Sequence, residues 1–161
     1  MSHILRYYNS EKIEVGIDEA GRGCVLGSLY IGAFIADEDL KDEHLRDLGV
    51  DDSKRLTAKR RTETRTKLKN VGYHDVRAVT AEQIDNGNLN ELEESVIAEL
   101  VRKWRPDQVI VDALGHPSTL PKVIARLSRR VAPLEPTWVM EPKADQKYPL
   151  VGAASIMAKT E

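Results

Sequence analysis

Short apolar, β-branched runs alternate along this chain with longer segments that begin at helix-capping residues. The apolar runs predict strands and the capped segments predict helices. The predicted strands are 13–18, 24–36, 71–79, 108–112 and 137–140. The predicted helices are 57–70, a short one after Thr80, 89–104, 121–130 and 151–159. This order of strands and helices predicts an α/β fold with a mixed sheet.

Capping residues and apolar spacing define the central helices more closely. Thr80 with Gln83, and Asn88 with Glu91, have the spacing of reciprocal N-terminal caps. The long helix carries an apolar stripe at i+4 intervals, which we expect to pack on the sheet. Its members are Leu92, Val96, Leu100 and Trp104.

The last two predicted segments differ sharply in polarity. Residues 143–149 are polar and predict a loop, in which Tyr148 is expected to act as an anchor. Residues 151–159 are rich in small side chains, so this helix can lie close against the sheet.

Length and charge narrow the class of protein. A chain of 161 residues with 41% hydrophobic residues suits a single domain. The formal charge of −2 conceals a net charge of −6 in residues 37–52 and of +7 in residues 54–69. The near-zero total therefore does not exclude a local basic patch for nucleic acid.

The sequence also predicts where the protein is located. It has a single cysteine, Cys24, and it lacks both an apolar run of membrane length and a secretory signal. These features predict a cytoplasmic protein.

Acidic residues end two of the buried strands. Asp18 and Glu19 follow one apolar run, and Asp112 follows another. Ligands of open α/β sheets gather beyond the carboxyl ends of the strands, so these acids are expected to converge. Clustered carboxylates repel one another unless a cation is present, and oxygen ligands favour Mg²⁺ or Mn²⁺. The four histidines lack the spacing of a zinc site.

Two polar segments are candidates for contacts with phosphate or sugar. Gly21, Arg22 and Gly23 lack the Lys-Ser/Thr ending of a nucleotide-binding P-loop, but glycines allow close backbone approach and the arginine offers a bidentate contact. Ser53 and Lys54 stand just before a predicted helix, where a hydroxyl and an ammonium group can hold a phosphate.

The chain resembles the type 2 ribonucleases H, specifically ribonuclease HII of the archaeal and eukaryotic-like kind. Five motifs carry the resemblance in family order: GIDEAGRG (16–23), DSK (52–54), NLNELE (88–93), VDAL (111–114) and KYPLVGAASIMAK (147–159). The resemblance implies an RNase H-like mixed five-stranded sheet flanked by helices. It also implies that the first strand, which carries two of the acids, lies beside the fourth strand, which carries the third acid. Residues 1–161 would form one catalytic domain without the family's C-terminal segment.

The resemblance also implies an activity. The family cuts the RNA strand of RNA–DNA hybrids and cuts at ribonucleotides embedded in duplex DNA, using two divalent ions held by four carboxylates. By motif, Asp18, Glu19 and Asp112 are three of these carboxylates. The loop 21–23 would read the RNA–DNA junction, and Ser53 with Lys54 would contact a phosphate. Two-metal hydrolysis would leave 5′-phosphate and 3′-hydroxyl ends.

The resemblance places the fourth carboxylate in an Arg-Asp pair two positions beyond Glu161. This chain is therefore expected to lack it and to be a weak or inactive, monomeric nuclease. Glu161 is a poor substitute, because two residues along a helix point about 200° apart. Two alternatives remain open: a non-catalytic nucleic-acid-binding module, and another metal nuclease of the same superfold, such as a junction resolvase. A sliding-clamp partner cannot be read from the sequence.

Overall fold

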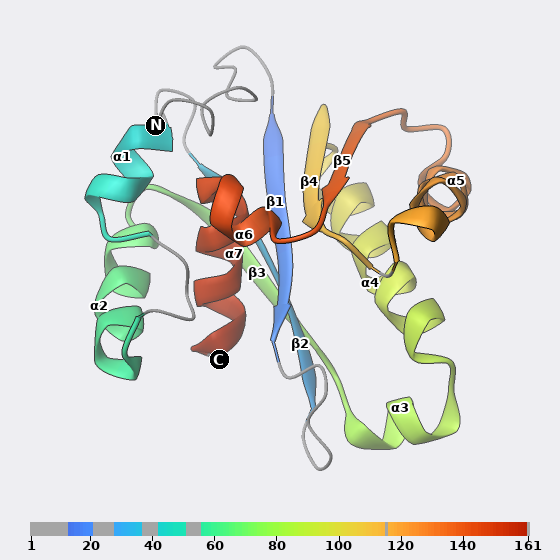
Figure 1. Cartoon of the computed structure of the whole chain (residues 1–161), viewed down its shortest axis with the longest axis horizontal. Helices are drawn as coiled ribbons and strands as arrows, with labels where there is room; N and C mark the ends of the chain where they lie inside the picture. The colour runs from blue at the N-terminus through green and yellow to red at the C-terminus, as the bar shows by residue number, and fades with distance from the viewer. Residues whose placement is uncertain (1–12, 21–27, 37–41, 51–55, 115, 161) are drawn as a thin grey trace.

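A computed structural model describes residues 13–20, 28–36, 42–50, 56–114 and 116–160. Within these residues the chain forms one five-stranded sheet with helices on both faces (Figure 1). The strands are β1 (Glu14–Ala20), β2 (Leu29–Ala36), β3 (Gly72–Val79), β4 (Gln108–Asp112) and β5 (Thr137–Glu141). The α-helices are α1 (Asp42–Asp47), α2 (Ala58–Leu68), α3 (Ala81–Asn86), α4 (Leu89–Trp104), α5 (Leu120–Val131), α6 (Ala144–Lys147) and α7 (Pro149–Lys159), and a 3-10 turn, η2, covers Pro117–Thr119. The expected mixed α/β sheet is confirmed.

The strand order is β3-β2-β1-β4-β5. The strands β1, β2 and β3 pair antiparallel, whereas β4 is parallel to both β1 and β5. The expected neighbours β1 and β4 therefore lie side by side at the centre of the sheet, and the carboxyl ends of β1, β4 and β5 lie at the same edge.

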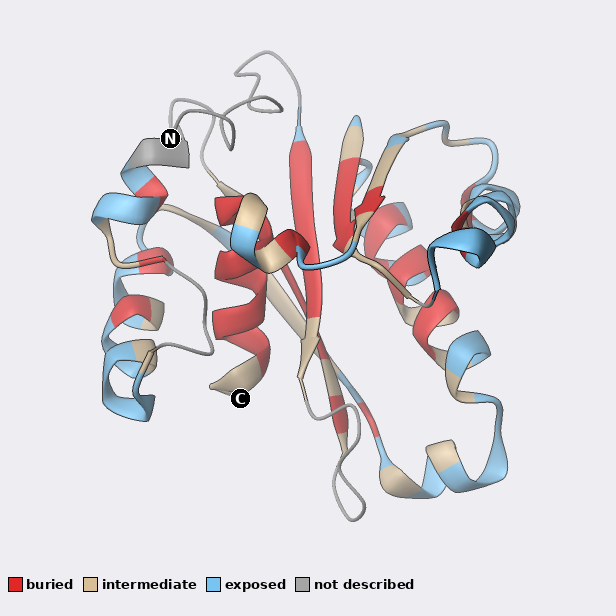
Figure 2. Ribbon diagram, in the orientation of Figure 1, coloured by how far each residue is buried: buried red, intermediate tan, exposed pale blue. Residues whose placement is uncertain are grey.

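Two apolar cores lie on opposite faces of the sheet. One joins the sheet to α4 and α5, through residues such as Ile97 and Leu127. The other is built around α7, whose residues from Pro149 to Ala158 are all buried (Figure 2). None of the helices in the described ranges is long and apolar enough to cross a membrane.

Glycines of β1 and β2 let α7 lie directly on the sheet. A Cβ atom built on Gly16 would come 2.3 Å from the carbonyl carbon of Leu150, and one on Gly32 would come 2.4 Å from the carbonyl oxygen of Ala154. Both distances are far below van der Waals contact, so no side chain fits at either position. The close packing predicted for the small-residue helix is confirmed, and the helix begins two residues earlier than predicted.

The structure confirms the predicted helix caps. The Thr57 hydroxyl accepts a hydrogen bond from the backbone N–H of Arg60, and the Asn88 side chain accepts one from Glu91. Thr80 and Gln83 form the full reciprocal capping box. These bonds satisfy backbone donors that a helix N-terminus leaves without partners.

Two predictions need correction, and a third is tested only in part. The described part of the second strand begins at Leu29, and residues 24–27 of the predicted range lie outside the described residues. Leu92, Val96 and Leu100 of the predicted stripe pack on the core, but an i+4 stripe drifts around a helix of 3.6 residues per turn. The most buried apolar residues of α4 are therefore Ile97, Ala98, Leu100 and Val101. The polar stretch 143–149, predicted as a loop, contains the one-turn helix α6 and the start of α7.

Candidate active site

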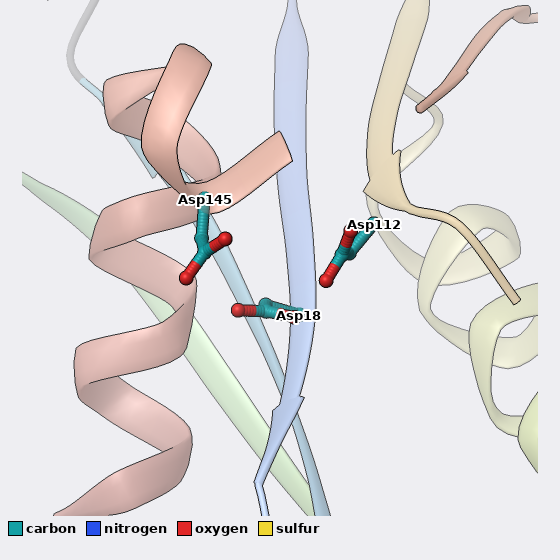
Figure 3. A group of neighbouring side chains, drawn as sticks. All are labelled: Asp18, Asp112 and Asp145. Carbon is teal, nitrogen blue, oxygen red and sulfur yellow. The ribbon is translucent and has the colours of Figure 1, made fainter. Parts of the chain in front are cut away.

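Three carboxylates from separate elements meet at the carboxyl edge of the sheet. Asp18 lies in β1, Asp112 ends β4, and Asp145 belongs to α6. One carboxylate oxygen from each lies within 4.8 Å of the others, and Figure 3 shows the three side chains pointing toward one another.

The sheet register brings the first two carboxylates together. Ile17 of β1 is the parallel partner of Val111 in β4, so the next residues, Asp18 and Asp112, occupy neighbouring positions. Side chains alternate between the faces of a sheet. Asp18 therefore shares a face with Gly16, which contacts α7. The first two carboxylates thus lie on the face that α7 covers.

The side-chain carboxylate of Asp112 connects the end of β4 to α6. Its Oδ1 accepts from the N–H of Ala113 at 3.0 Å and from the N–H of Ala144 at 3.3 Å. The carbonyl of Glu141, in β5, accepts from the N–H of Ala113 at 2.9 Å. Since Ala144 begins α6, the carboxylate of Asp112 also fixes where this helix starts.

The acid–base equilibrium of Asp18 is strongly shifted. The pKa of Asp18 is raised from 3.8 to about 7, chiefly by burial and to a smaller extent by the nearby charges of Asp112 and Asp145. Hydrogen bonds from the backbone of Glu19 and the hydroxyl of Ser155, on α7, act in the opposite direction. The side chain is only 6% exposed. The charged form of a buried carboxylate with two acidic neighbours is unfavourable, and a bound cation would stabilise it.

The donor set fits a hard divalent cation. Carboxylate oxygens are the ligands that Mg²⁺ and Mn²⁺ prefer, and the three come from elements fixed by the sheet, its register and the Ala144 hydrogen bond. No histidine or cysteine belongs to this group, so its chemistry differs from that of a zinc site.

The predicted site residues fall into two sets. Asp18 and Asp112 converge, as the strand ends indicated, and Glu19 lines a small hollow with both of them, although it is not one of the three converging carboxylates. The candidate substrate contacts lie outside the residues that the structure describes. They are Gly21, Arg22, Gly23, Ser53 and Lys54.

Asp145 is not predicted from the sequence. The family resemblance places the remaining carboxylate beyond Glu161, and the polar pattern of 143–149 predicts a loop, whereas the structure places Asp145 beside Asp18 and Asp112. One signal was available. The segment follows β5, which is parallel to β4, so an acid just after β5 lies at the same edge of the sheet as Asp112.

Comparisons with known proteins agree with this geometry. The profile of the ribonuclease HII family matches residues 15–161. Ribonuclease HII of Archaeoglobus fulgidus is 38% identical over 154 residues, a match that covers 92% of this chain and 71% of that protein. The corresponding match to the Aeropyrum pernix enzyme is also 38% identical and covers 91% of this chain and 66% of that protein.

A solved structure shows the same fold. The crystal structure of ribonuclease H2 from Pyrococcus horikoshii superposes with a TM-score of 0.80 at 37% identity, over 92% of this chain and 71% of that one. The chain thus spans about two thirds or slightly more of the length of the relatives that it matches. Family profile, relatives and fold agree, and the chain belongs to the ribonuclease HII family of metal-dependent ribonuclease H enzymes.

Proposed function

We propose that this chain is an endonuclease that hydrolyses the RNA strand of RNA–DNA hybrids and cuts at ribonucleotides embedded in duplex DNA. The observation that carries the proposal is the convergence of Asp18, Asp112 and Asp145 in a chain of the ribonuclease HII family. With Glu19 beside Asp18 and Asp112, four carboxylates are available at this edge of the sheet. Four is also the number of metal-binding carboxylates that the family resemblance implies.

The carboxylates have distinct roles in this proposal. Asp18, Asp112 and Asp145 would hold the cations, and Glu19 would complete the set from the neighbouring position of β1. When bound, two Mg²⁺ or Mn²⁺ ions supply an activated water and stabilise the leaving 3′-oxygen of a phosphodiester. Ser155 holds the carboxylate of Asp18 in place, and the N–H groups of Ala113 and Ala144 do so for Asp112.

The presence of Asp145 changes the activity expected of this chain. The family motif places one carboxylate beyond residue 161, which implies a weak or inactive form. We propose that Asp145 is this carboxylate, so that the chain contains every acidic ligand it needs. We also propose that the loop 21–23 reads the ribonucleotide and that Ser53 and Lys54 contact a phosphate, as the family motifs imply.

A cleavage assay tests the function directly. The 161-residue chain is incubated with an RNA–DNA hybrid, a DNA duplex containing one ribonucleotide and a plain DNA duplex, each in Mg²⁺, Mn²⁺ or EDTA. We expect cleavage of the first two substrates with either metal, with 5′-phosphate and 3′-hydroxyl products, and none in EDTA. Asp112→Asn should abolish cleavage and leave the circular dichroism spectrum unchanged.

Two results would contradict the proposal. Binding of the hybrid that does not depend on Mg²⁺, without cleavage in Mn²⁺, would indicate a nucleic-acid-binding module instead. Equal cleavage of plain DNA would indicate another metal nuclease of the same superfold.

The cellular setting is also a proposal. The single cysteine supports a reducing, cytoplasmic location, and we propose that the chain acts as a monomer. The A. fulgidus relative was solved in a complex with PCNA, and that chain superposes with a TM-score of 0.79 at 34% identity, over 91% of this chain and 70% of that one. A sliding clamp is therefore the protein partner to test first.

A further inference from the structure

A fifth acid at the same sheet edge, Glu141, is hydrogen-bonded to other partners. Glu141 ends β5 and is the register partner of Asp112, so its side chain lies on the same face of the sheet. It is nevertheless not one of the three converging carboxylates. Its Oε1 accepts a hydrogen bond from Nζ of Lys147 at 3.1 Å, and its Oε2 accepts one from the hydroxyl of Tyr148.

These two hydrogen bonds attach the segment that carries Asp145 to the end of β5. Lys147 is the last residue of α6 and Tyr148 follows it, so the carboxylate of Glu141 binds the C-terminal end of this helix. The N-terminal end is bound by Asp112, through the N–H of Ala144. Asp145 lies between the two attachments.

The helix α6 needs external support because it is a single turn. It comprises four residues and has no side-chain N-cap, and a helix of this length is unstable by itself. Asp145 is repelled by Asp18 and Asp112, since carboxylates this close disfavour one another's charge. Asp18 and Asp112 are fixed in strands, so the helix is the part that the repulsion would displace.

The partners of Glu141 are suited to resisting that displacement. Tyr148 is buried, with 2% of its surface exposed, so its ring is fixed in the core around α7. Lys147 balances the charge of Glu141 across an ion pair that is only partly exposed. Hydrogen bonds to an ionised acceptor are stronger than those between neutral groups.

We propose that Glu141 is a positioning residue that, through Lys147 and Tyr148, holds Asp145 close enough to Asp18 and Asp112 for the three to bind one divalent cation. This inference rests on the proposed function. It assigns to Glu141 no contact with the cation or the substrate. Both carboxylate oxygens of Glu141 already accept hydrogen bonds from side chains of the segment that they hold.

Calorimetric titration of the chain with Mn²⁺ tests the role of Glu141 without any substrate. Loss of a residue that orients a metal ligand typically lowers metal affinity about 10- to 100-fold, and we expect a loss in this range for Glu141→Ala. Glu141→Gln, which keeps an acceptor for Tyr148, should lose less than Glu141→Ala. Glu99→Ala is the matched control, because it removes an exposed ion pair to Arg77 away from the site and should bind Mn²⁺ like the wild type.

Cleavage of the hybrid at increasing Mn²⁺ supplies a second measurement. The ligands themselves are intact in Glu141→Ala, so saturating Mn²⁺ should restore its kcat to within a few fold of the wild type. Asp145→Asn should not be restored. If Glu141→Ala fails to fold, Tyr148→Phe replaces it in both experiments, because it removes one hydroxyl and keeps the buried ring.

The two proposals fail in different ways. Wild-type Mn²⁺ affinity in both Glu141→Ala and Tyr148→Phe, with reduced affinity in Asp145→Asn, would overturn the positioning role alone. A loss in Glu141→Gln as large as in Asp145→Asn, and not restored by excess metal, would show that Glu141 is itself a ligand and would also overturn it. Unchanged affinity in Asp145→Asn and Asp112→Asn would overturn the metal site and the proposed function.

Discussion

Asp145 is the residue whose role changes most between sequence and structure. It carries one of three converging carboxylates, and we predict that Asp145→Asn lowers kcat/KM for hybrid cleavage at least about 100-fold, which corresponds to about 2.7 kcal/mol. The amide keeps the shape of the side chain but loses the negative charge that binds the cation. Steady-state cleavage at fixed Mg²⁺ measures the effect. Asp85→Asn, on the exposed surface of α3, is the control, and wild-type kcat/KM in Asp145→Asn would remove Asp145 from the site.

Asp18 should make the stability of the metal-free protein depend on pH. Its pKa is about 7 in the folded protein and about 3.9 in an unfolded chain. At a pH between these two values, Asp18 is therefore mostly protonated in the folded state and mostly ionised in the unfolded state. The free energy of unfolding should therefore fall as pH rises from about 4 to 7, by a few kcal/mol, and level off above that range.

Urea unfolding in EDTA at a series of pH values measures this dependence. The informative quantity is the difference between the wild type and Asp18→Asn, since other groups titrate in both proteins. We expect the wild type to lose stability relative to Asp18→Asn as pH rises. A constant difference across this range would show that the pKa of Asp18 is close to its ordinary value.

The residues of the site differ in how well their roles can be predicted from the sequence. Asp18 and Asp112 each end an apolar run, and the convergence of strand ends follows from the topology of α/β sheets. Asp145 lies in a polar stretch whose single helical turn is held by contacts with Asp112 and Glu141. Such contacts join residues far apart in the chain, or depend on a fold already formed, so no local pattern predicts them.

At the scale of elements, the packing of α7 on β1 and β2 supports the site, because Ser155 of this helix hydrogen-bonds Asp18. We predict that Gly32→Ala destabilises the protein by about 1–3 kcal/mol or more, since its methyl group would meet the backbone oxygen of Ala154 at 2.4 Å. Displacement of α7 should also reduce cleavage. Thermal unfolding measures the loss.

Gly87→Ala provides the comparison for Gly32→Ala. Gly87 has an extended backbone, and its nearest neighbour to an added Cβ is the carbonyl oxygen of Gln83 at 3.2 Å, so a small local shift accommodates the methyl group. Equal losses of stability in the two variants would contradict the importance of the close approach between α7 and the sheet.

The elements themselves were largely predictable, for reasons that are local. Thr57, Thr80 and Asn88 cap helices through bonds to residues three positions away, and every strand except the more polar β3 contains a short apolar run. Two elements were not predicted as helices. The helix α1 lies in a strongly acidic segment and α6 has only four residues, so neither shows an apolar period long enough to detect.

At the scale of the whole molecule, cation binding should stabilise the fold, because the ligands belong to β1, β4 and α6 and come together only in the folded chain. A cation present at 100 times its Kd adds about 2.7 kcal/mol, which raises the Tm of a domain of this size by roughly 5–10 °C. Thermal unfolding in Mn²⁺ and in EDTA at equal ionic strength measures the shift. Asp112→Asn should lose most of it and Asp85→Asn none. The same shift in Asp112→Asn as in the wild type would mean that Mn²⁺ binds elsewhere, and that the three carboxylates are not the metal site.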